Sequence, residues 1–428
     1  MNTIFATATA RGRAGISVVR ISGPQAFLAV EKYARPLPEM RKAALRKFCR
    51  DSEFIDECLV LCFNEGSSFT GEPVVEFQIH GSIAIERAVL SALQDLPGFR
   101  LAEPGEFSRR ALMNDRMDLA QIEGLGDLIE AETEAQRKQA LKLFSGALGE
   151  RASKWRKELI RAAALLEATI DFADEDVPVD VSPEVMDLLA RVSDDISDEI
   201  QGSGAAERIR EGFEIAIVGP PNAGKSTLLN ALAGRDAAIT SEIAGTTRDV
   251  IEVRMDLGGF AVTLLDTAGL RESDDVVESI GVSRAIERAK SADLRWFLSE
   301  EGDPESFGIG KAHDLFVTSK ADLKGTSGLS ISAVTGFGIE ELIAETLKRL
   351  EQMASGASTA ANQRQRHALE LANAALANAR IEVSRGPDFS ELAAEEIRTS
   401  VRTLEALVGH VDVEHVLDEV FSSFCLGK

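Results

Sequence analysis

The stretch FEIAIVGPPNAGKSTLLNALAG occupies residues 213–234 of the 428-residue chain. It starts with an apolar run typical of a buried strand, crosses a turn rich in Gly and Pro, and continues with the apolar spacing of a helix. Such a turn lets successive backbone N–H groups face a phosphate, and the dipole of the following helix adds a favourable potential. The stretch therefore predicts an α/β domain with a phosphate-binding loop of the P-loop type.

The residues of this loop have distinct chemical roles. Lys225 can reach the β- and γ-phosphates of a nucleoside triphosphate, and the Ser226 hydroxyl can ligate Mg²⁺. We therefore expect Lys225 to be a catalytic group and Mg²⁺ to be a cofactor. The further nucleotide contacts expected from the loop are those of Asn222, Ala223, Gly224 and Thr227.

Two motifs downstream complete the expected magnesium site. GTTRD (245–249) lies on a polar stretch, where Thr247 is placed to complete the shell of the metal. DTAG (266–269) ends an apolar strand, so Asp266 can hold the metal through a water and the Gly269 N–H can sense the γ-phosphate. The other nucleotide contacts expected from DTAG are those of Thr267 and Ala268.

A guanine site is expected from SKAD (319–322), which follows the strand HDLFVT. Asp322 can accept the two N–H donors of guanine, which adenine cannot offer in the same way. In this order the motifs predict a Ras-like G domain that binds GTP. The other residues expected around the base are Ser319, Lys320, Ser332 and Ala333.

Two positions depart from the usual G-domain pattern. Ser319 stands where the guanine motif NKxD has Asn, and Ser cannot make the same bidentate contacts, so we expect guanine affinity to be lowered. Leu270 stands where Ras-type enzymes have a Gln that positions the attacking water. Glu278 is the nearest attractive carboxylate, although taken alone a solvated charge at a helix start is the favoured interpretation. Arg248 is interpreted as structural.

The chain divides into segments that differ in their hydrophobic periodicity and turn residues. Short β-rich runs with turns and one helix predict an α/β or α+β domain first, and the later segments alternate between helical and α/β patterns. The simplest architecture is a discontinuous helical domain with the G domain inserted between its two parts. The predicted boundaries are 1–117 for the first domain, 118–211 and 353–428 for the helical domain, and 212–352 for the G domain.

Local patterns give three further expectations. QGSGAAERIREG (201–212) predicts a hinge into the G domain because of its small residues. SGLSISA (327–333) is interpreted as the last strand of a parallel sheet. The short stretch between DLRWFLS and HDLFVTS predicts that one helix of the usual fold is trimmed.

Composition limits the function classes. A formal charge of −23 argues against a general nucleic-acid coat, although a local basic patch or a partner could still hold a nucleic acid. No apolar run approaches the roughly 18 residues needed to span a bilayer, so we expect a cytoplasmic protein without a membrane partner. Three of the four cysteines cluster at Cys49, Cys58 and Cys62 without a C-x-x-C pair, which disfavours a zinc site.

Several long strings outside the phosphate loop carry a resemblance. VVRISGP, SFTGEPVVEFQIHG, PGEFSRRALMNDRMDLAQIEGLGDLI, ATIDFADEDV and the terminal FCLGK, together with the G motifs, resemble the MnmE (TrmE) family of tRNA wobble-uridine modification GTPases. The resemblance implies an N-terminal domain like those that bind folate in one-carbon enzymes, which dimerises and binds 5-formyl-tetrahydrofolate or a related cofactor. The positions that match its ligand contacts are Arg20, Glu76, Arg116, where the family has Lys, and Lys428. Cys425 in the terminal C-x-G-K is a possible modification residue, and an inert terminus is the alternative.

The resemblance also includes the loop that holds potassium in this family. The resemblance implies that K⁺ supplies the positive charge that an arginine finger gives elsewhere, and that two G domains meet face to face and position Glu278. The residues that match the potassium ligands are Asn222, Ser241, Ile243 and Thr246, of which Ser241 and Thr246 also belong to the GTP site.

The implied reaction adds an aminomethyl or carboxymethylaminomethyl group to C5 of the wobble uridine of tRNA. The one-carbon unit comes from methylene-tetrahydrofolate, and the work is shared with the flavoprotein partner MnmG (GidA). One alternative is a ribosome-assembly or regulatory GTPase of the Era or Der kind, but such proteins append a basic RNA-binding domain. Another is a folate-dependent transferase with a decayed G domain, which Ser319 favours and the intact Lys225 opposes.

Overall fold

The computed structural model describes residues 2–10, 12–171, 180–234, 252–266, 287–300, 309–324, 328–409, 420–421, 424 and 427. The chain forms two units. The first comprises Met1–Gly126, Gly149–Ser153 and Arg402–Lys428, and the second comprises Asp127–Leu148 and Lys154–Val401. Among the described residues, no helix is both long enough and apolar enough to cross a membrane.

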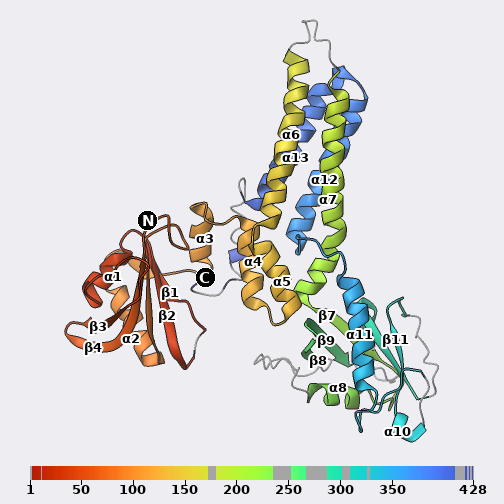
Figure 1. The fold of residues 1–428 in the computed structure, drawn as a ribbon, viewed down its shortest axis with the longest axis horizontal. Helices are drawn as coiled ribbons and strands as arrows, with labels where there is room; N and C mark the ends of the chain where they lie inside the picture. Colours follow the sequence, from red (N-terminus) through yellow and green to blue (C-terminus); the bar gives the residue numbers. More distant parts are fainter. Residues whose placement is uncertain are drawn as a thin grey trace, which may run out of the picture. The chain divides into compact units, whose positions relative to one another are not determined.

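The first unit is built on a six-stranded sheet in the order β3-β4-β5-β2-β1-β6 (Figure 1). Neighbouring strands are antiparallel except β1 and β6, which run parallel. The strands are β1 (Thr3–Thr7), β2 (Ala14–Ser22), β3 (Ala44–Arg50), β4 (Glu53–Phe63), β5 (Val74–Gly81) and β6 (Phe99–Leu101). The sequence predicted β2, β4 and β5, and it missed the shorter or more charged strands β1, β3 and β6.

Side-chain alternation gives this sheet one apolar face and one face with charged side chains. Val75, Phe77 and Ile79 of β5 are buried in the core beneath α1 (Ala26–Tyr33) and α2 (Ile83–Gln94). Because successive side chains of a strand point to opposite faces, Glu76 lies on the other face, together with Arg20 of the paired strand β2. That other face carries α3 (Glu106–Met113), whose Phe107 packs in a small core with Ile4 and Ala6 of β1.

Long helices make up much of the second unit (Figure 1). Its helices outside the second sheet include α5 (Glu134–Phe144), α6 (Ala147–Asp171), α7 (Ser182–Glu211), α12 (Gln363–Ser384), the short 3₁₀ helix η1 (Pro387–Phe389) and α13 (Ser390–Val408). Most of α4 (Leu119–Glu130), residues 149–153 of α6 and the end of α13 from Arg402 belong to the first unit. Helix α7 packs against both α5 and α12. Segments on either side of the second sheet in the sequence are therefore joined in space.

The hinge predicted at 201–212 is wrong, because α7 continues unbroken through it to Glu211. A Gly inside a helix costs about 0.5–1 kcal/mol relative to Ala, so packing must stabilise the helix here. Gly202 serves that packing, since an added Cβ would lie 2.5 Å from the Gly356 carbonyl oxygen and 2.7 Å from Ser358 Cβ. The small residues therefore mark a close crossing and not a flexible joint.

The second sheet has five strands in the order β11-β10-β7-β9-β8. Its strands are β7 (Phe213–Val218), β8 (Glu252–Leu257), β9 (Phe260–Asp266), β10 (Leu294–Ser299) and β11 (Leu315–Thr318), and its helices are α8 (Lys225–Ala233), α10 (Ala321–Lys324) and α11 (Ile339–Ala354). All neighbours are parallel except β8 and β9. Helices α8 and α11 contribute Leu228 and Leu342 to the core on one face.

Two strand predictions in this sheet need correction. The described part of the predicted strand 327–333, residues 328–333, is not a strand, because only Ser330 pairs there, in an isolated bridge with Thr318. The sequence also missed β8, whose charged Glu252 and Arg254 alternate with apolar residues at the sheet edge. For the trimmed helix, the described part of the connection between β10 and β11, residues 309–314, contains no helix.

A buried carboxylate binds the segment by which the chain returns from the second sheet to the helices. Glu199 of α7 is 1% exposed, and its Oε1 accepts hydrogen bonds from the backbone N–H groups of Thr359 at 2.5 Å and Ala360 at 2.7 Å. Gln139 of α5 adds a bond from its Nε2 to the Ser358 carbonyl oxygen at 2.9 Å. The return segment 355–362 is thus fixed between α11 and α12.

We expect Glu199→Ala to lower the free energy of unfolding of the second unit by about 1.5–3 kcal/mol, because two buried N–H groups lose a charged acceptor. Glu199→Gln keeps an acceptor oxygen and should lose less. Urea unfolding followed by circular dichroism measures both. The exposed neighbour Asp198→Asn removes a similar charge and serves as control; equal midpoints for Glu199→Ala and this control would contradict the assignment.

Candidate functional site

The phosphate loop connects β7 to α8 in a conformation suited to anions. Asn222 and Gly224 adopt left-handed φ angles of 65° and 91°, which curl the loop ahead of the helix N-terminus. Alternation of right- and left-handed residues turns successive backbone N–H groups into a concave anion site. The sequence prediction of strand, loop and helix over 213–234 is confirmed here.

Lys225 lies folded over this loop. Its Nζ donates hydrogen bonds to the carbonyl oxygens of Gly219 at 2.8 Å and Pro220 at 3.0 Å. Burial lowers the pKa of Lys225 below its ordinary value, while the nearby Asp266 carboxylate acts in the opposite direction. A bound phosphate would therefore give the buried ammonium a charge partner better than two carbonyl oxygens.

The residues expected to hold magnesium meet next to the loop. β7 and β9 pair so that Asp266 lies opposite Ile217, and the Ser226 hydroxyl donates to Asp266 Oδ2 at 2.7 Å. Asp266 is 3% exposed, and its Oδ1 has no hydrogen-bond partner among the described residues. A buried carboxylate oxygen without a donor is costly, and a hydrated divalent cation would satisfy it. Ser226 and Asp266 thus fit a hydrated Mg²⁺.

The guanine motif and the segment expected behind the base are joined by backbone bonds. Ala321 N–H donates to the Ile331 carbonyl at 3.0 Å, and Ile331 N–H donates to Thr318 at 2.8 Å. These bonds bring Ser319–Asp322 beside Ser332 and Ala333. Ser319 is 3% exposed, and its N–H donates to the Ser299 carbonyl at 2.8 Å. Lys320 forms an ion pair with Glu300, whereas Asp322 is exposed.

Part of the predicted site lies outside the described residues. These residues are Ser241, Ile243, Thr246, Thr247, Thr267, Ala268, Gly269, Glu278, Cys425 and Lys428. Their assignments remain predictions.

In the first unit, Arg20 stands at the centre of the predicted one-carbon site. Its Nε donates to Glu76 Oε1 at 2.9 Å across the β2–β5 pair. Its guanidinium lies 5.4 Å from the centre of the Phe69 ring and 5.9 Å from that of Phe107. Two aromatic rings and a cation make a surface suited to a flat heteroaromatic ring with polar edges.

Arg116 belongs to the same region through the loop before β5. Its Cγ and Cδ lie 3.3 and 3.4 Å from where a Cβ of Gly71 would be, and Gly71 is two residues from Phe69. The chain terminus also reaches this unit, because an added Cβ at Gly427 would meet the carbonyl of Thr7 at the end of β1. Phe421, six residues earlier, packs against Leu119 and Ile122.

Two comparisons with known proteins bear on this arrangement. A model described as "GTP-binding protein TrmE N-terminus" matches residues 3–116, and "MnmE helical domain" matches residues 119–425. A protein of Cereibacter sphaeroides named "tRNA modification GTPase MnmE" is 58% identical over 429 residues, covering 100% of both chains. A protein of the same name from Roseobacter denitrificans is 57% identical over 430 residues, also covering 100% of both.

The chain belongs to the MnmE family of tRNA modification GTPases. The resemblance found in the sequence is thereby confirmed. The fold is mixed α/β with a helical part and an N-terminal domain of the TrmE type. Full-length matches to MnmE relatives favour this family over the GTPases of the Era or Der kind considered above.

Sequence reasoning missed a buried ionic network that supports the MnmE-type N-terminal domain. Arg110 of α3 bonds Glu72 at 2.9 Å and Glu106 at 3.0 Å, and the Ser22 hydroxyl donates to Glu72 at 2.7 Å. Burial acts to raise the pKa of Glu106, but hydrogen bonds from Arg100, the Glu103 N–H and Arg110 hold it below its ordinary value. The spacing of Glu106 and Arg110 by four residues in PGEFSRRALM was the available signal.

Two cysteines of the first unit, Cys58 and Cys62, face its core. Cys58 and Cys62 are buried on β4 and are free, as is Cys49. Burial raises the pKa of Cys58 to about 12 and that of Cys62 to about 11, so both thiols stay protonated and unreactive. Among the described residues, no cluster of three or more His, Cys, Asp and Glu side chains is placed to hold a metal ion.

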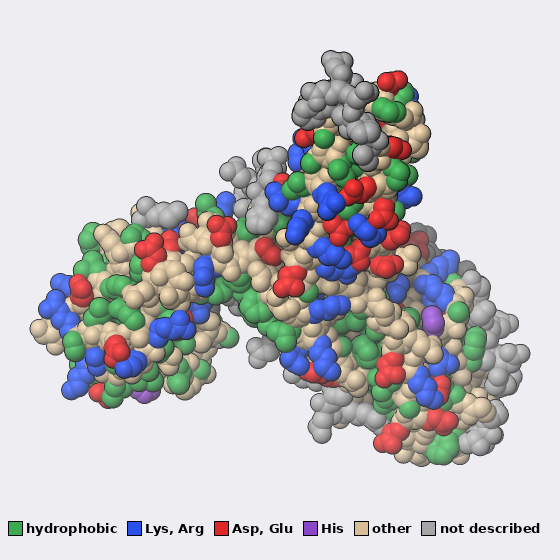
Figure 2. Space-filling view, turned by 45° about the horizontal axis from the view of Figure 1, so that its top comes forward, with side chains coloured by type: hydrophobic (Ala, Val, Ile, Leu, Met, Phe, Trp, Pro, Cys, Tyr) green, Lys and Arg blue, Asp and Glu red, His purple; other side chains and the backbone are tan. Residues whose placement is uncertain are grey.

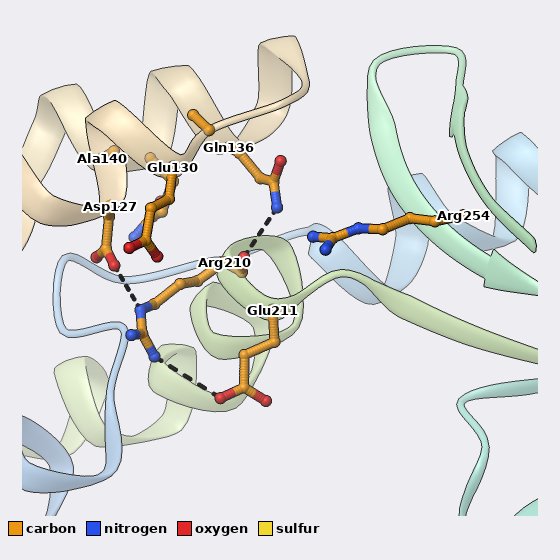
Figure 3. A pocket seen from close by; sticks show the side chains of 9 residues that line it. Asp127, Glu130, Gln136, Ala140, Arg210, Glu211 and Arg254 are labelled. Carbon is orange, nitrogen blue, oxygen red and sulfur yellow. Dashed lines mark hydrogen bonds and ion pairs between the residues drawn. The ribbon is translucent and has the colours of Figure 1, made fainter. Parts of the chain in front are cut away.

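A separate polar cavity of about 280 Å³ lies in the second unit, at the end of α7 (Figure 3). Arg210 bonds Asp127 at 2.7 Å, Gln136 Nε2 donates to the Arg210 carbonyl at 2.9 Å, and Arg254 of β8 pairs with Glu132 at 2.9 Å. The charges of these two arginines are met by acidic partners. The cavity is therefore a polar junction between helices and β8, and it is distinct from the phosphate loop.

We expect Asp266→Asn to remove most of the Mg²⁺-dependent part of nucleotide binding, because the neutral amide no longer attracts the hydrated cation. The measurement is the thermal shift produced by GDP with Mg²⁺ against GDP with a chelator. The exposed Glu340→Gln in the same unit is the control and should behave as wild type. An unchanged difference between the two conditions in Asp266→Asn would show that Asp266 is not part of the metal site.

Proposed function

We propose that this chain is a GTP-hydrolysing enzyme of tRNA modification that acts on C5 of the wobble uridine. The observation that carries the proposal is the phosphate loop with Lys225 buried over it and Asp266 Oδ1 left without a partner beside Ser226. Lys225, Ser226 and Asp266 support a site for a magnesium nucleotide, and the full-length relatives are named for the activity. The cytoplasm is the expected compartment.

In the proposed GTP site, Lys225 and the loop N–H groups bind the phosphates, and Ser226 and Thr247 ligate Mg²⁺. Asn222, Ser241, Ile243 and Thr246 would hold K⁺, whose charge would stabilise the developing negative charge. Glu278 would orient the attacking water once two G domains of a homodimer meet. SKAD would select guanine through Asp322, with Ser319 making fewer bonds to the base than Asn.

In the proposed one-carbon site, Arg20 and Glu76 bind the polar edge of a 5-formyl- or methylene-tetrahydrofolate, and Phe69 and Phe107 bracket it. Arg116 and Lys428 would meet its glutamate carboxylates. Gly427 lies at Thr7, which supports a tail position near this site, and Cys425 is proposed as a possible modification residue. The flavin- and NADH-using partner MnmG (GidA) would share the reaction.

The proposed domain organisation follows the sequence boundaries. Residues 1–117 form the folate-binding-like dimerisation domain, 118–211 and 353–428 form one helical domain, and 212–352 form the inserted G domain. Contact between α7 and α12 and the Glu199 bonds to segment 355–362 support the insertion.

We expect GTP hydrolysis to be at least tenfold faster in K⁺ than in Na⁺ at matched ionic strength, because the smaller cation fits the expected ligands less well. Glu278→Ala should abolish the stimulated rate and leave nucleotide affinity near wild type, because the residue acts on water and not on the bound phosphates. Phosphate release in the two salts and fluorescent-nucleotide binding measure these effects. Equal slow rates in both salts would reject the cation mechanism.

We expect Arg20→Gln to weaken binding of 5-formyl-tetrahydrofolate by about tenfold or more, since a charge-assisted hydrogen bond contributes about 1.5–3 kcal/mol. Titration calorimetry on the full chain measures the affinity. Arg87→Gln on α2, which covers the opposite face of the sheet, removes the same charge as a control. Wild-type affinity in Arg20→Gln, or equal loss in both variants, would count against this site.

A further inference from the structure

A basic block stands out in an otherwise acidic chain. Residues 137–161 contain eight Lys and Arg against two Asp and Glu, while the whole chain has a formal charge of −23. The block covers most of α5 and the first half of α6. Figure 2 shows both basic and acidic side chains gathered over the helices of the second unit.

Three basic residues of α6 form a stripe on its exposed side. Lys154, Lys157 and Arg161 recur at spacings of three and four residues, which places them on one side of a helix. All three are exposed, whereas the opposite side of the helix buries Trp155 and Leu159. We call Lys154, Lys157 and Arg161 the α6 stripe.

The acidic residues beside the stripe offset only part of its positive charge. Glu158, the acidic residue within it, lies 3.8 Å from Arg191 of α7. Arg161 pairs with Glu184, and both side chains are largely exposed, so water and salt weaken that pair. Within the described part of the chain, Lys154 and Lys157 form no ion pair.

Helix α5 carries further positive charge. Lys138 and Lys142 are exposed, and Lys142 Nζ donates only to the backbone carbonyl of Ala357 at 3.4 Å, which does not neutralise it. Glu134 is shared between Arg137 at 2.7 Å and Lys138 at 3.4 Å, so one carboxylate serves two cations. The basic block therefore carries a net positive charge on solvent-facing helix surfaces.

We propose that the α6 stripe docks the tRNA substrate by its backbone phosphates. The inference rests on the proposed function and names the surface that this function requires. A chain with net negative charge repels a polyanion over most of its surface, so binding must use a local patch where cations outnumber acids. Flexible, unpaired lysines bind phosphates by charge without reading bases, which suits an enzyme that positions tRNA and acts elsewhere on it.

The test is filter binding of unmodified tRNA to the full-length protein between low and moderate salt. Lys154→Gln/Lys157→Gln should weaken binding by about five- to tenfold near physiological salt and reduce the slope of log K against log salt by about 2. GTP hydrolysis without tRNA should stay at the wild-type rate, which shows that the variant is folded. The control Lys32→Gln/Lys47→Gln removes the same charge from exposed positions of the first unit and should bind as wild type.

Three outcomes would overturn the proposal. Wild-type tRNA affinity and salt slope in the α6 double variant would show that the stripe does not contact phosphates. An equal loss of tRNA affinity in the control variant would show that the effect comes from the net charge of the protein and not from the stripe. Loss of flavoprotein binding with tRNA binding intact would assign the stripe to a protein partner. Absence of any tRNA binding by the wild-type protein would instead count against the proposed function itself, so the two failures are distinguishable.

Discussion

The second unit depends on one buried carboxylate, that of Glu199. The chain departs from α7, builds a five-stranded sheet, and must re-enter the helices at α12 without leaving its backbone groups unpaired. Glu199 receives two N–H groups of the return segment, and Gly202, one turn along, gives that segment room to cross. A charged acceptor buried with its donors is stabilising, whereas the same carboxylate without them would be strongly unfavourable.

The sheet is also tied to the helices at its far edge. The hairpin between β8 and β9 places the Gly259 carbonyl where the Ala135 N–H of α5 donates to it at 2.9 Å, and Arg254 of β8 pairs with Glu132. β9 ends at Asp266, beside the phosphate loop. The same two strands therefore hold a magnesium candidate at one end and the helical part at the other.

Sequence reasoning succeeded where local chemistry decides structure. The phosphate loop, the strands that precede its motifs and the pairing of Ser226 with Asp266 all follow from residue types with fixed roles. It failed where tertiary packing decides: Gly202 suggested a hinge although it serves a helix crossing, and β8 has too many charges to look like a strand. The Arg110 network escaped notice because Glu72 and Arg110 are far apart in sequence and meet only after folding.

The crossing of α7 with α12 also bears on how the chain is made. The strands and helices from β7 to α11 lie in one continuous run of sequence, so this part has its partners at hand once Ala354 has been synthesised. Helix α7 is synthesised earlier, and it cannot pack against α12 until that helix, more than a hundred residues later, has been made. Closing so long a loop is slow, because chain entropy is lost before the contact is gained. During synthesis on the ribosome, the side of α7 that packs against α12 therefore stays exposed until α12 has been made, and it offers chaperones an apolar surface.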